Sequence, residues 1–355
     1  MKHSVKLVIL IPVLLIIVIA GYVWHSGFLS GGAPLEEITI GTNINGMLGL
    51  LFIAETRGYY QEQGLKVSLN SYQTGLGPLR DLKAGRLDLA SCADFALVSE
   101  IFAGGADELR CLAIIAAGEV DWLIGRRDRG VNRPEDLRGK IIGVPRNTSA
   151  EFFLGRFLTL NRISLKDVTV VDIKPLDLAD ALAAGKVDAV LIWAPLAQDI
   201  IKKVGPETIA WPAQGGQNVY RLLATREEYI KSKPAVLEKL LRALAQAADY
   251  LKRRPEAGRV IIAQRLKENL PGLQPGKFSI NFEPFLDQGL LLVMEDQARW
   301  MIQNRLTEQT RVPNYLNYID AEPLAKVDPK AVRIIIPKPE RPVAPAPSGT
   351  GEDRR

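Results

Sequence analysis

Leu82–Leu89 reads Leu-Lys-Ala-Gly-Arg-Leu-Asp-Leu, and Leu182–Ala189 repeats it as Leu-Ala-Ala-Gly-Lys-Val-Asp-Ala. In each copy a glycine ends an amphipathic helical stretch, because glycine readily takes the left-handed conformation that commonly follows a helix. A short apolar run, typical of a buried strand, comes next. One copy would be ordinary in any α/β protein. Two copies with matching flanks indicate two similar lobes in one chain.

Short apolar runs alternate with amphipathic stretches on both sides of each copy. This alternation predicts an α/β protein with parallel sheets and crossover helices. Beyond Pro234 the pattern is mainly helical. The expected strands are Glu37–Thr42, Gly64–Leu69, Leu87–Ser91, Leu109–Ala116, Ile141–Val144, Val168–Val171, Val187–Trp193 and Tyr220–Ala224.

The chain divides into five predicted parts. Residues 34–125 form the first part of lobe 1, and residues 126–224 form lobe 2. Residues 225–336 return to lobe 1 and add the C-terminal helices. Residues 337–355 are dominated by proline, glycine and charge, which predicts a disordered tail. Residues 1–33 hold a hydrophobic segment and a Gly-rich spacer.

The hydrophobic segment Leu7–Trp24 contains no charged residue, and its length of roughly 18 residues is near that needed to span a bilayer. A secretory signal peptide and an uncleaved signal anchor share this layout. Ala20-Gly21-Tyr22 matches a cleavage site poorly, which favours the anchor. Lys2 and Lys6 would then hold the N-terminus in the cytoplasm. We therefore expect a membrane-anchored protein whose globular part is extracytoplasmic, on the periplasmic or outer face.

The composition is that of a globular protein, with 47% hydrophobic and 24% charged residues. A chain of 355 residues can form two ordinary domains. The formal net charge is +5, of which Lys2 and Lys6 supply two, and the remaining charges are interspersed. Without a basic stripe interleaved with aromatics, nucleic-acid binding is not expected.

Histidine and cysteine are scarce. The two histidines, His3 and His25, flank the hydrophobic N-terminus, so the globular region offers no imidazole as a base or metal ligand. Cys92 and Cys111 lack the spacing of a zinc or iron–sulfur site. The sequence predicts two buried free thiols, although a disulfide outside the cytoplasm stays open. We expect no cofactor and no metal.

Several motifs occur in a familiar order. They are Ala54-Glu55-x-x-Gly58-Tyr59-Tyr60, Gly64-Leu65-x-Val67, the first repeat, Leu137-Arg138-Gly139-Lys140-Ile141-Ile142-Gly143-Val144, the second repeat with Trp193-x-Pro195, Pro234-x-x-x-x-x-x-Leu241-x-Ala243 and Pro255-Glu256. In this order they resemble the solute-binding components of ABC importers in the nitrate/sulfonate/taurine family (SsuA/TauA, NMT1/THI5-like). The resemblance covers about Glu37 to Ala263.

The resemblance implies a type II periplasmic-binding-protein-like fold, in which two α/β lobes enclose a ligand cleft. It implies a solute-binding protein rather than an enzyme. Such a protein captures a small solute, of an anionic sulfonate-, nitrate- or taurine-like kind, and passes it to ABC permease and ATPase subunits. Two alternatives stay open. One is a membrane-anchored ligand sensor, and the other is an enzyme on the same fold, of the pyrimidine- or menaquinone-precursor type.

Ligands of parallel α/β sheets bind at loops beyond the carboxyl ends of the strands. Glycine-rich loops and helix starts in these positions present free N–H groups that favour an anion. The predicted ligand-binding residues are Thr42, Asn43, Asn45, Gly75, Leu76, Gly77, Ser91, Asp94, Asn147, Thr148, Ser149 and Trp193.

Several of these residues also have a structural interpretation. Thr148 with Glu151 three residues on matches a capping box, which would simply begin a helix. Asp94 fits an N-cap as well as a partner for a ligand ammonium group. The repeated Asp88 and Asp188 are expected to fix the turn between helix and strand rather than to contact a ligand.

The remaining alternatives concern glycine and tryptophan. Gly75 and Gly77 fit a turn as well as a close approach to an anion. Trp193 fits the hydrophobic core as well as the wall of a cleft. Sequence alone leaves both open.

Overall fold

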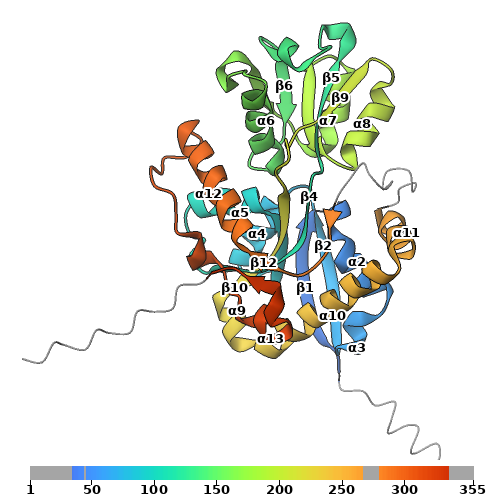
Figure 1. The fold of residues 1–355 in the computed structure, drawn as a ribbon, viewed down its shortest axis with the longest axis vertical. Helices are drawn as coiled ribbons and strands as arrows, with labels where there is room; N and C mark the ends of the chain where they lie inside the picture. The colour runs from blue at the N-terminus through green and yellow to red at the C-terminus, as the bar shows by residue number, and fades with distance from the viewer. Residues whose placement is uncertain (1–33, 44, 267–279, 336–355) are drawn as a thin grey trace, which may run out of the picture.

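The computed structural model describes residues 34–43, 45–266 and 280–335. Two β-sheets, each covered by helices, form two lobes one above the other (Figure 1). Buried apolar residues of both lobes belong to one continuous core. This is the predicted α/β architecture.

The larger lobe contains a six-stranded sheet in the order β11-β4-β10-β3-β1-β2. Strands β1 to β4 run parallel, while β10 and β11 run antiparallel to them. A small two-stranded sheet, β12-β13, lies beside it. The strands are β1 (Glu36–Asn43), β2 (Leu65–Tyr72), β3 (Leu89–Ala93), β4 (Leu109–Gly118), β10 (Val219–Arg226), β11 (Ile280–Asn281), β12 (Leu286–Asp287) and β13 (Val332–Arg333).

The smaller lobe contains a five-stranded sheet in the order β7-β6-β8-β5-β9. Here β5 alone runs antiparallel to its neighbours. The strands are β5 (Asp121–Arg126), β6 (Ile141–Val144), β7 (Thr169–Asp172), β8 (Ala189–Trp193) and β9 (Thr208–Pro212).

Most of the described helices belong to the larger lobe. These are α2 (Gly49–Thr56), α3 (Tyr59–Glu62), α4 (Leu76–Lys83), α5 (Asp94–Phe102), α9 (Glu227–Ser232), α10 (Pro234–Arg253), α11 (Pro255–Leu266), α12 (Gln288–Gln303) and α13 (Glu322–Val327). The smaller lobe carries α6 (Ser149–Leu160), α7 (Leu178–Ala183) and α8 (Leu196–Val204).

The two lobes share one topology. The larger sheet contains the order β2-β1-β3-β10-β4, and the smaller sheet repeats it as β7-β6-β8-β5-β9. In both, the strand that follows the repeated motif lies between a parallel neighbour and an antiparallel strand arriving from the other lobe. The prediction of two similar lobes is confirmed, but the prediction of parallel sheets misses these antiparallel strands.

The repeated aspartate joins its motif to the neighbouring strand. Asp88 accepts hydrogen bonds of 2.8 Å from both the backbone N–H and the hydroxyl of Thr39 in β1. Asp188 accepts one of 2.9 Å from the N–H of Ile141, the first residue of β6, and one of 2.7 Å from Arg129 Nε. The expected structural role of both aspartates is confirmed.

The antiparallel strands end on matching arginines. Arg226 at the end of β10 donates hydrogen bonds to the carbonyls of Leu82 and Leu87. Arg126 at the end of β5 donates to those of Leu182 and Ala183. Each arginine therefore satisfies carbonyl groups within its own lobe's repeat, including those of the last turn of the helix that begins it, α4 or α7, where a cation also suits the helix dipole.

Both predicted lobe boundaries lie too far along the chain. Residues 121–126 form β5 of the smaller sheet, although the prediction assigned most of them to lobe 1. Residues 219–224 belong to β10 of the larger sheet, although the prediction assigned them to lobe 2. The apolar run of each strand begins directly after its crossover, so the pattern of the run hides the change of lobe.

Besides the two crossover segments, helix α12 also connects the lobes. Its Trp300 packs edge-on against Phe152 of α6, with ring centroids 5.6 Å apart, and also against Phe95 of α5 at 5.9 Å. Gly155 makes this approach possible, because a side chain there would overlap the Trp300 ring. Helix α12 thus touches both lobes (Figure 1).

Among the described residues, no helix is both long and apolar enough to cross a bilayer. The predicted N-terminal anchor falls within residues 1–33 and the predicted tail within residues 337–355. Both therefore lie outside the described residues and stay predictions.

Candidate functional site between the lobes

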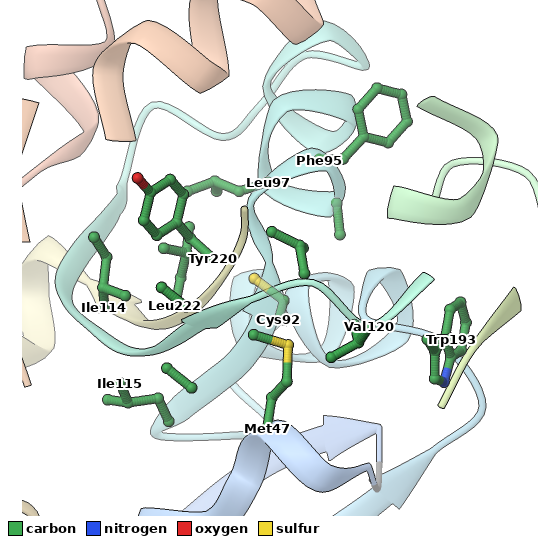
Figure 2. Packing of buried hydrophobic residues seen from close by; sticks show 14 of the residues in the cluster. Met47, Cys92, Phe95, Leu97, Ile114, Ile115, Val120, Trp193, Tyr220 and Leu222 are labelled. Carbon is green, nitrogen blue, oxygen red and sulfur yellow. The ribbon is translucent and has the colours of Figure 1, made fainter. Parts of the chain in front are cut away.

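A small cavity lies where the two lobes and both crossover segments meet. Figure 2 shows three of its side chains, Met47 from the larger lobe, Val120 from the first crossover and Trp193 from the smaller lobe. Its volume of about 20 Å³ is enough for roughly one water-sized group, so a larger ligand requires the lobes to separate. The lining residues are Asn43, Asn45, Met47, Gly75, Ala93, Ala96, Val120, Thr148, Ser149, Trp193, Val219 and Arg221.

A larger cavity, of about 550 Å³, lies between α10 and residues 280–285. It is lined by the larger lobe alone, with charges of both signs such as Asp249, Lys252 and Glu283. We assign the candidate site to the smaller cavity, because that one collects polar groups from both lobes at the carboxyl ends of the parallel strands.

Six of the twelve predicted residues line this cavity, and six do not. Those lining it are Asn43, Asn45, Gly75, Thr148, Ser149 and Trp193. Thr42, Leu76, Gly77, Ser91, Asp94 and Asn147 lie outside its lining. The structure therefore brings half of the predicted residues together around one cavity.

Five of the six other residues have the following surroundings, and Asp94 is described below. Thr42 and Ser91 are fully buried beneath the lining, and Leu76 belongs to the first turn of α4. Gly77 allows close packing of Tyr72, whose ring a side chain there would overlap. Asn147 is exposed and has a positive φ of 56°.

The predicted capping box at α6 is wrong. The Thr148 hydroxyl donates to the carbonyl of Pro145 at 2.6 Å instead of accepting from the helix. Glu151 accepts from the N–H of Asn147 at 2.8 Å and from Arg146 at 3.0 Å, one residue earlier than a capping box requires. Helix α6 therefore begins at the cavity without the predicted pair of capping hydrogen bonds between Thr148 and Glu151.

Arg221 is the functional candidate that the sequence analysis missed. It lies in β10, is almost fully buried, and donates to the side chain of Asn43 at 2.8 Å and to the carbonyl of Ser91 at 3.3 Å. Its Nε, although buried, has no hydrogen-bond partner. Burial lowers the pKa of Arg221 to about 10, which still leaves it positively charged at neutral pH.

The signal for Arg221 was a single charge inside the apolar run Val219–Ala224. A search of the carboxyl ends of strands overlooks it, because β10 is antiparallel and therefore brings its beginning to that edge of the sheet. A buried arginine beside Thr148, Ser149 and a helix start makes this cavity suited to an anion.

Two buried carboxyl groups lie close to the cavity. Asp94 at the start of α5 accepts from the N–H groups of Phe95 at 2.8 Å and Tyr220 at 3.3 Å. Burial raises the pKa of Asp94 to about 7, and these hydrogen bonds and Arg221 oppose the rise. Burial also raises the pKa of Asp121 to about 7, an effect that Ser149 opposes and the charge of Asp94 reinforces.

The described residues contain no group of three or more His, Cys, Asp or Glu side chains that could hold a metal ion. Cys92 and Cys111 are both buried and are not bonded to each other. Burial raises the pKa of Cys92 to about 12, which keeps it a neutral thiol. The prediction of two buried free thiols is confirmed.

The sequence model described as NMT1/THI5 like matches residues 45–258, which is more than half of the chain. The chain belongs to the NMT1/THI5-like family. The family resemblance drawn from the motif order is thus confirmed. The match begins at the loop after β1 and runs through both lobes into α11.

Relatives of this NMT1/THI5-like protein include a provisionally named binding protein of Brucella abortus (strain 2308), 26% identical over 62% of this chain and 69% of that one. A protein of Bacillus subtilis (strain 168), provisionally named as binding aliphatic sulfonates, is 27% identical over 53% of this chain and 56% of that one.

Two solved structures establish the fold of this family member. The periplasmic aliphatic sulphonate binding protein SsuA from Escherichia coli has a TM-score of 0.64 at 17% identity, covering 80% of this chain and 97% of that one. The desulfurization enzyme DSZB has a TM-score of 0.58 at 16% identity, covering 82% and 99%. The predicted periplasmic-binding-protein fold is confirmed, and the fold by itself accommodates both a binder and an enzyme.

Proposed function

We propose that this chain is the extracytoplasmic solute-binding protein of an ABC importer. It closes its two lobes around a small anionic solute, of a sulfonate-, nitrate- or taurine-like kind, and delivers it to a membrane permease. The family membership and the sulfonate-binding relatives support this function. A predicted N-terminal anchor would keep the protein at the extracytoplasmic face of the membrane.

The observation that carries the proposal is the buried Arg221. A guanidinium that is almost fully buried loses its hydration, and the unpartnered Nε leaves one of its donors unused. An anion in the cavity would accept from that donor. Thr148 and Ser149, at the start of α6, line the same cavity from the other lobe, so an anion there would contact both lobes and favour the closed state.

The neighbouring enzyme structure supplies one rival, an enzyme on this fold. The chemistry of this chain does not favour a cysteine-dependent reaction, because Cys92 has a raised pKa and both histidines lie outside the described residues. A membrane-anchored sensor is the other rival. It would bind the solute unchanged and signal to a partner instead of a permease.

Thermal unfolding of the full chain tests the proposal against a panel of alkanesulfonates, nitrate, carboxylates, amino acids and pyrimidines. We expect at least one anionic class to stabilise the protein, by about 2.7 kcal/mol at a hundredfold excess over its dissociation constant. The solute should be recovered unchanged. Arg221→Gln should abolish the effect, while the control Arg242→Gln, on the exposed side of α10, should keep it.

Conversion of the solute would contradict the binder and support the enzyme. Failure of every anion would contradict the proposed solute class. Transport and sensing are separated by reconstituting the chain with ABC permease and ATPase subunits from the same organism, because only a transporter component stimulates solute-dependent ATP hydrolysis.

A further inference from the structure

Helix α12 is fixed to the larger lobe along most of its length. Leu290, Met294 and Ala298 on its inner face are fully buried, and the helix packs against α5 of that lobe. Its C-terminal end reaches toward α6 of the smaller lobe (Figure 1). The helix lies outside residues 45–258, so its role does not follow from the family match.

Trp300, near the C-terminal end of α12, makes the contact with the smaller lobe. Its ring packs edge-on against Phe152 of α6 and also lies against Phe95 of α5. Phe95 and Phe152 in turn stack on each other, with ring centroids 5.8 Å apart. The three rings therefore form one aromatic cluster, with members from both lobes.

Gly155 shows how closely Trp300 approaches α6. A Cβ atom at this position would lie 2.4 Å from the indole Nε1, well inside van der Waals contact. Glycine is unfavourable in the interior of a helix, and the close approach of Trp300 gives a physical reason for it here. Any larger residue at this position would displace the indole ring.

The aromatic cluster lies within one helical turn of the candidate site. Phe95 is next to Ala96, which lines the interlobe cavity. Phe152 follows Ser149, the first residue of α6 and another lining residue, by three positions. Trp300 itself does not line the cavity. It therefore influences the site only through the positions of α5 and α6.

The contact of Trp300 with α6 can break and form again at low cost. The half-buried ring also borders a cavity of about 230 Å³ between α12 and the smaller lobe, so it can leave Phe152 without opening a sealed void in the core. An edge-on pair of aromatic rings shifts an equilibrium about 2- to 10-fold. The contact is therefore strong enough to bias the lobes and weak enough to yield when they separate.

We propose that Trp300 is a positioning residue that holds α6 against α5 and thereby favours the closed arrangement of the two lobes. The inference rests on the proposed function and deepens it. Solute entry requires the lobes to separate, and this parts Trp300 from Phe152 because α12 stays with the larger lobe. The contact forms again on closure and adds to the stability of the closed, solute-bound state.

Distances between two spin labels measure the lobe arrangement on the full chain without any solute. Gln61→Cys in α3 and Leu176→Cys in the smaller lobe provide exposed labelling sites, while both native cysteines are buried. In pulsed EPR distance distributions, Trp300→Ala should raise the ratio of open to closed molecules at least about threefold. Trp300→Phe should recover part of the closed population, because an aromatic ring remains.

Two further variants separate positioning from folding. Trp211→Ala is the matched control, because Trp211 packs against Phe157 of the same helix α6, with centroids 6.3 Å apart, but within the smaller lobe. It should lower the melting temperature and leave the label distances unchanged. Gly155→Ala should open the lobes with Trp300 still present, because the added Cβ overlaps the indole while alanine itself favours the helix.

Wild-type distances in Trp300→Ala would overturn the role of Trp300, and Gly155→Ala decides in the same way should Trp300→Ala fail to fold. Equal opening in Trp211→Ala would overturn it too. The anion panel decides the proposed function separately. Any anion that stabilises the wild type should stabilise Trp300→Ala less, and an equal shift in melting temperature would sever Trp300 from solute binding. If no anion stabilises the wild type, the solute class falls, whereas the label distances still decide the role of Trp300.

Discussion

At the scale of single residues, the aspartate of each repeat has the same structural role in its lobe. Asp88 and Asp188 follow a helix-ending glycine, and each accepts a hydrogen bond from a backbone N–H at the neighbouring parallel strand. Gly85 and Gly185 have φ angles of 72° and 67°, which only glycine adopts readily. The motif therefore positions the strand that leads to the cleft.

Asp88→Ala should destabilise the protein by about 1–3 kcal/mol, because the N–H of Thr39 loses its side-chain acceptor in a partly buried place. Asp88→Asn should recover part of the loss, since an amide oxygen still accepts. The free energy of unfolding by urea measures both. Asp180→Ala, an exposed change, should stay within about 0.5 kcal/mol. Equal losses in the two alanine variants would contradict this role.

Part of the candidate site could be predicted from the sequence, because some of its residues directly follow parallel strands. Thr148, Ser149 and Trp193 follow parallel strands, and a rule about strand ends finds them. Arg221 lies near the start of the antiparallel strand β10, and nothing local in Val219–Ala224 reveals strand direction. Its place in the cavity comes from the pairing of distant strands, which a linear pattern does not contain.

At the scale of elements, Gln214 joins the two crossover segments. This fully buried side chain accepts from the N–H groups of Val120 and Asp121, and donates to the carbonyls of Gly118 at 3.2 Å and Gln217 at 2.7 Å. The single amide group of Gln214 thereby satisfies four backbone groups at the place where the two crossover segments pass between the lobes. We therefore expect Gln214 to restrict how far the lobes can move apart.

Gln214→Ala should cost about 2–4 kcal/mol, because two buried N–H groups lose their acceptor. It should also widen the range of lobe orientations, which small-angle X-ray scattering detects as a larger radius of gyration without solute. Gln61→Ala, at an exposed glutamine of α3, provides the control. A variant with wild-type stability and scattering would show that the crossovers are held together by other contacts.

The lobe boundaries show why element-scale prediction was incomplete. The alternation of strands and helices was clear enough to predict the α/β class and the duplication. The exchange of β5 and β10 between the lobes could not be predicted, because their apolar runs resemble those of strands that stay within one lobe. Strand existence depends on local periodicity, whereas sheet membership depends on tertiary pairing.

At the scale of the whole molecule, stability should depend on the two buried carboxyl groups. The pKa values of Asp94 and Asp121 are both raised to about 7 from an ordinary 3.8. The folded state therefore binds protons more tightly than the unfolded chain. Their contribution to stability is complete below about pH 4 and is lost as the pH rises through about 7, with a slope of up to ~1.4 kcal/mol per pH unit for each group.

Asp121→Asn should flatten this dependence and should exceed the wild type in stability at pH 8, since it removes a buried charge for which desolvation is the largest effect on the pKa. Urea unfolding at pH 5 and pH 8 measures the change for both proteins. Asp180→Asn should follow the wild type. Parallel curves for wild type and Asp121→Asn would contradict the raised pKa of this residue.

The strand order of the larger sheet has a consequence for how the chain is made. Strand β10 lies between β3 and β4, yet it leaves the ribosome after the whole of the smaller lobe. During synthesis the smaller lobe can complete its own sheet by Pro212, while β3 and β4 still await the strand between them. The lobe inserted in the middle of the sequence can therefore complete its sheet from a shorter length of chain than the larger lobe, whose sheet needs strands from both sides of it.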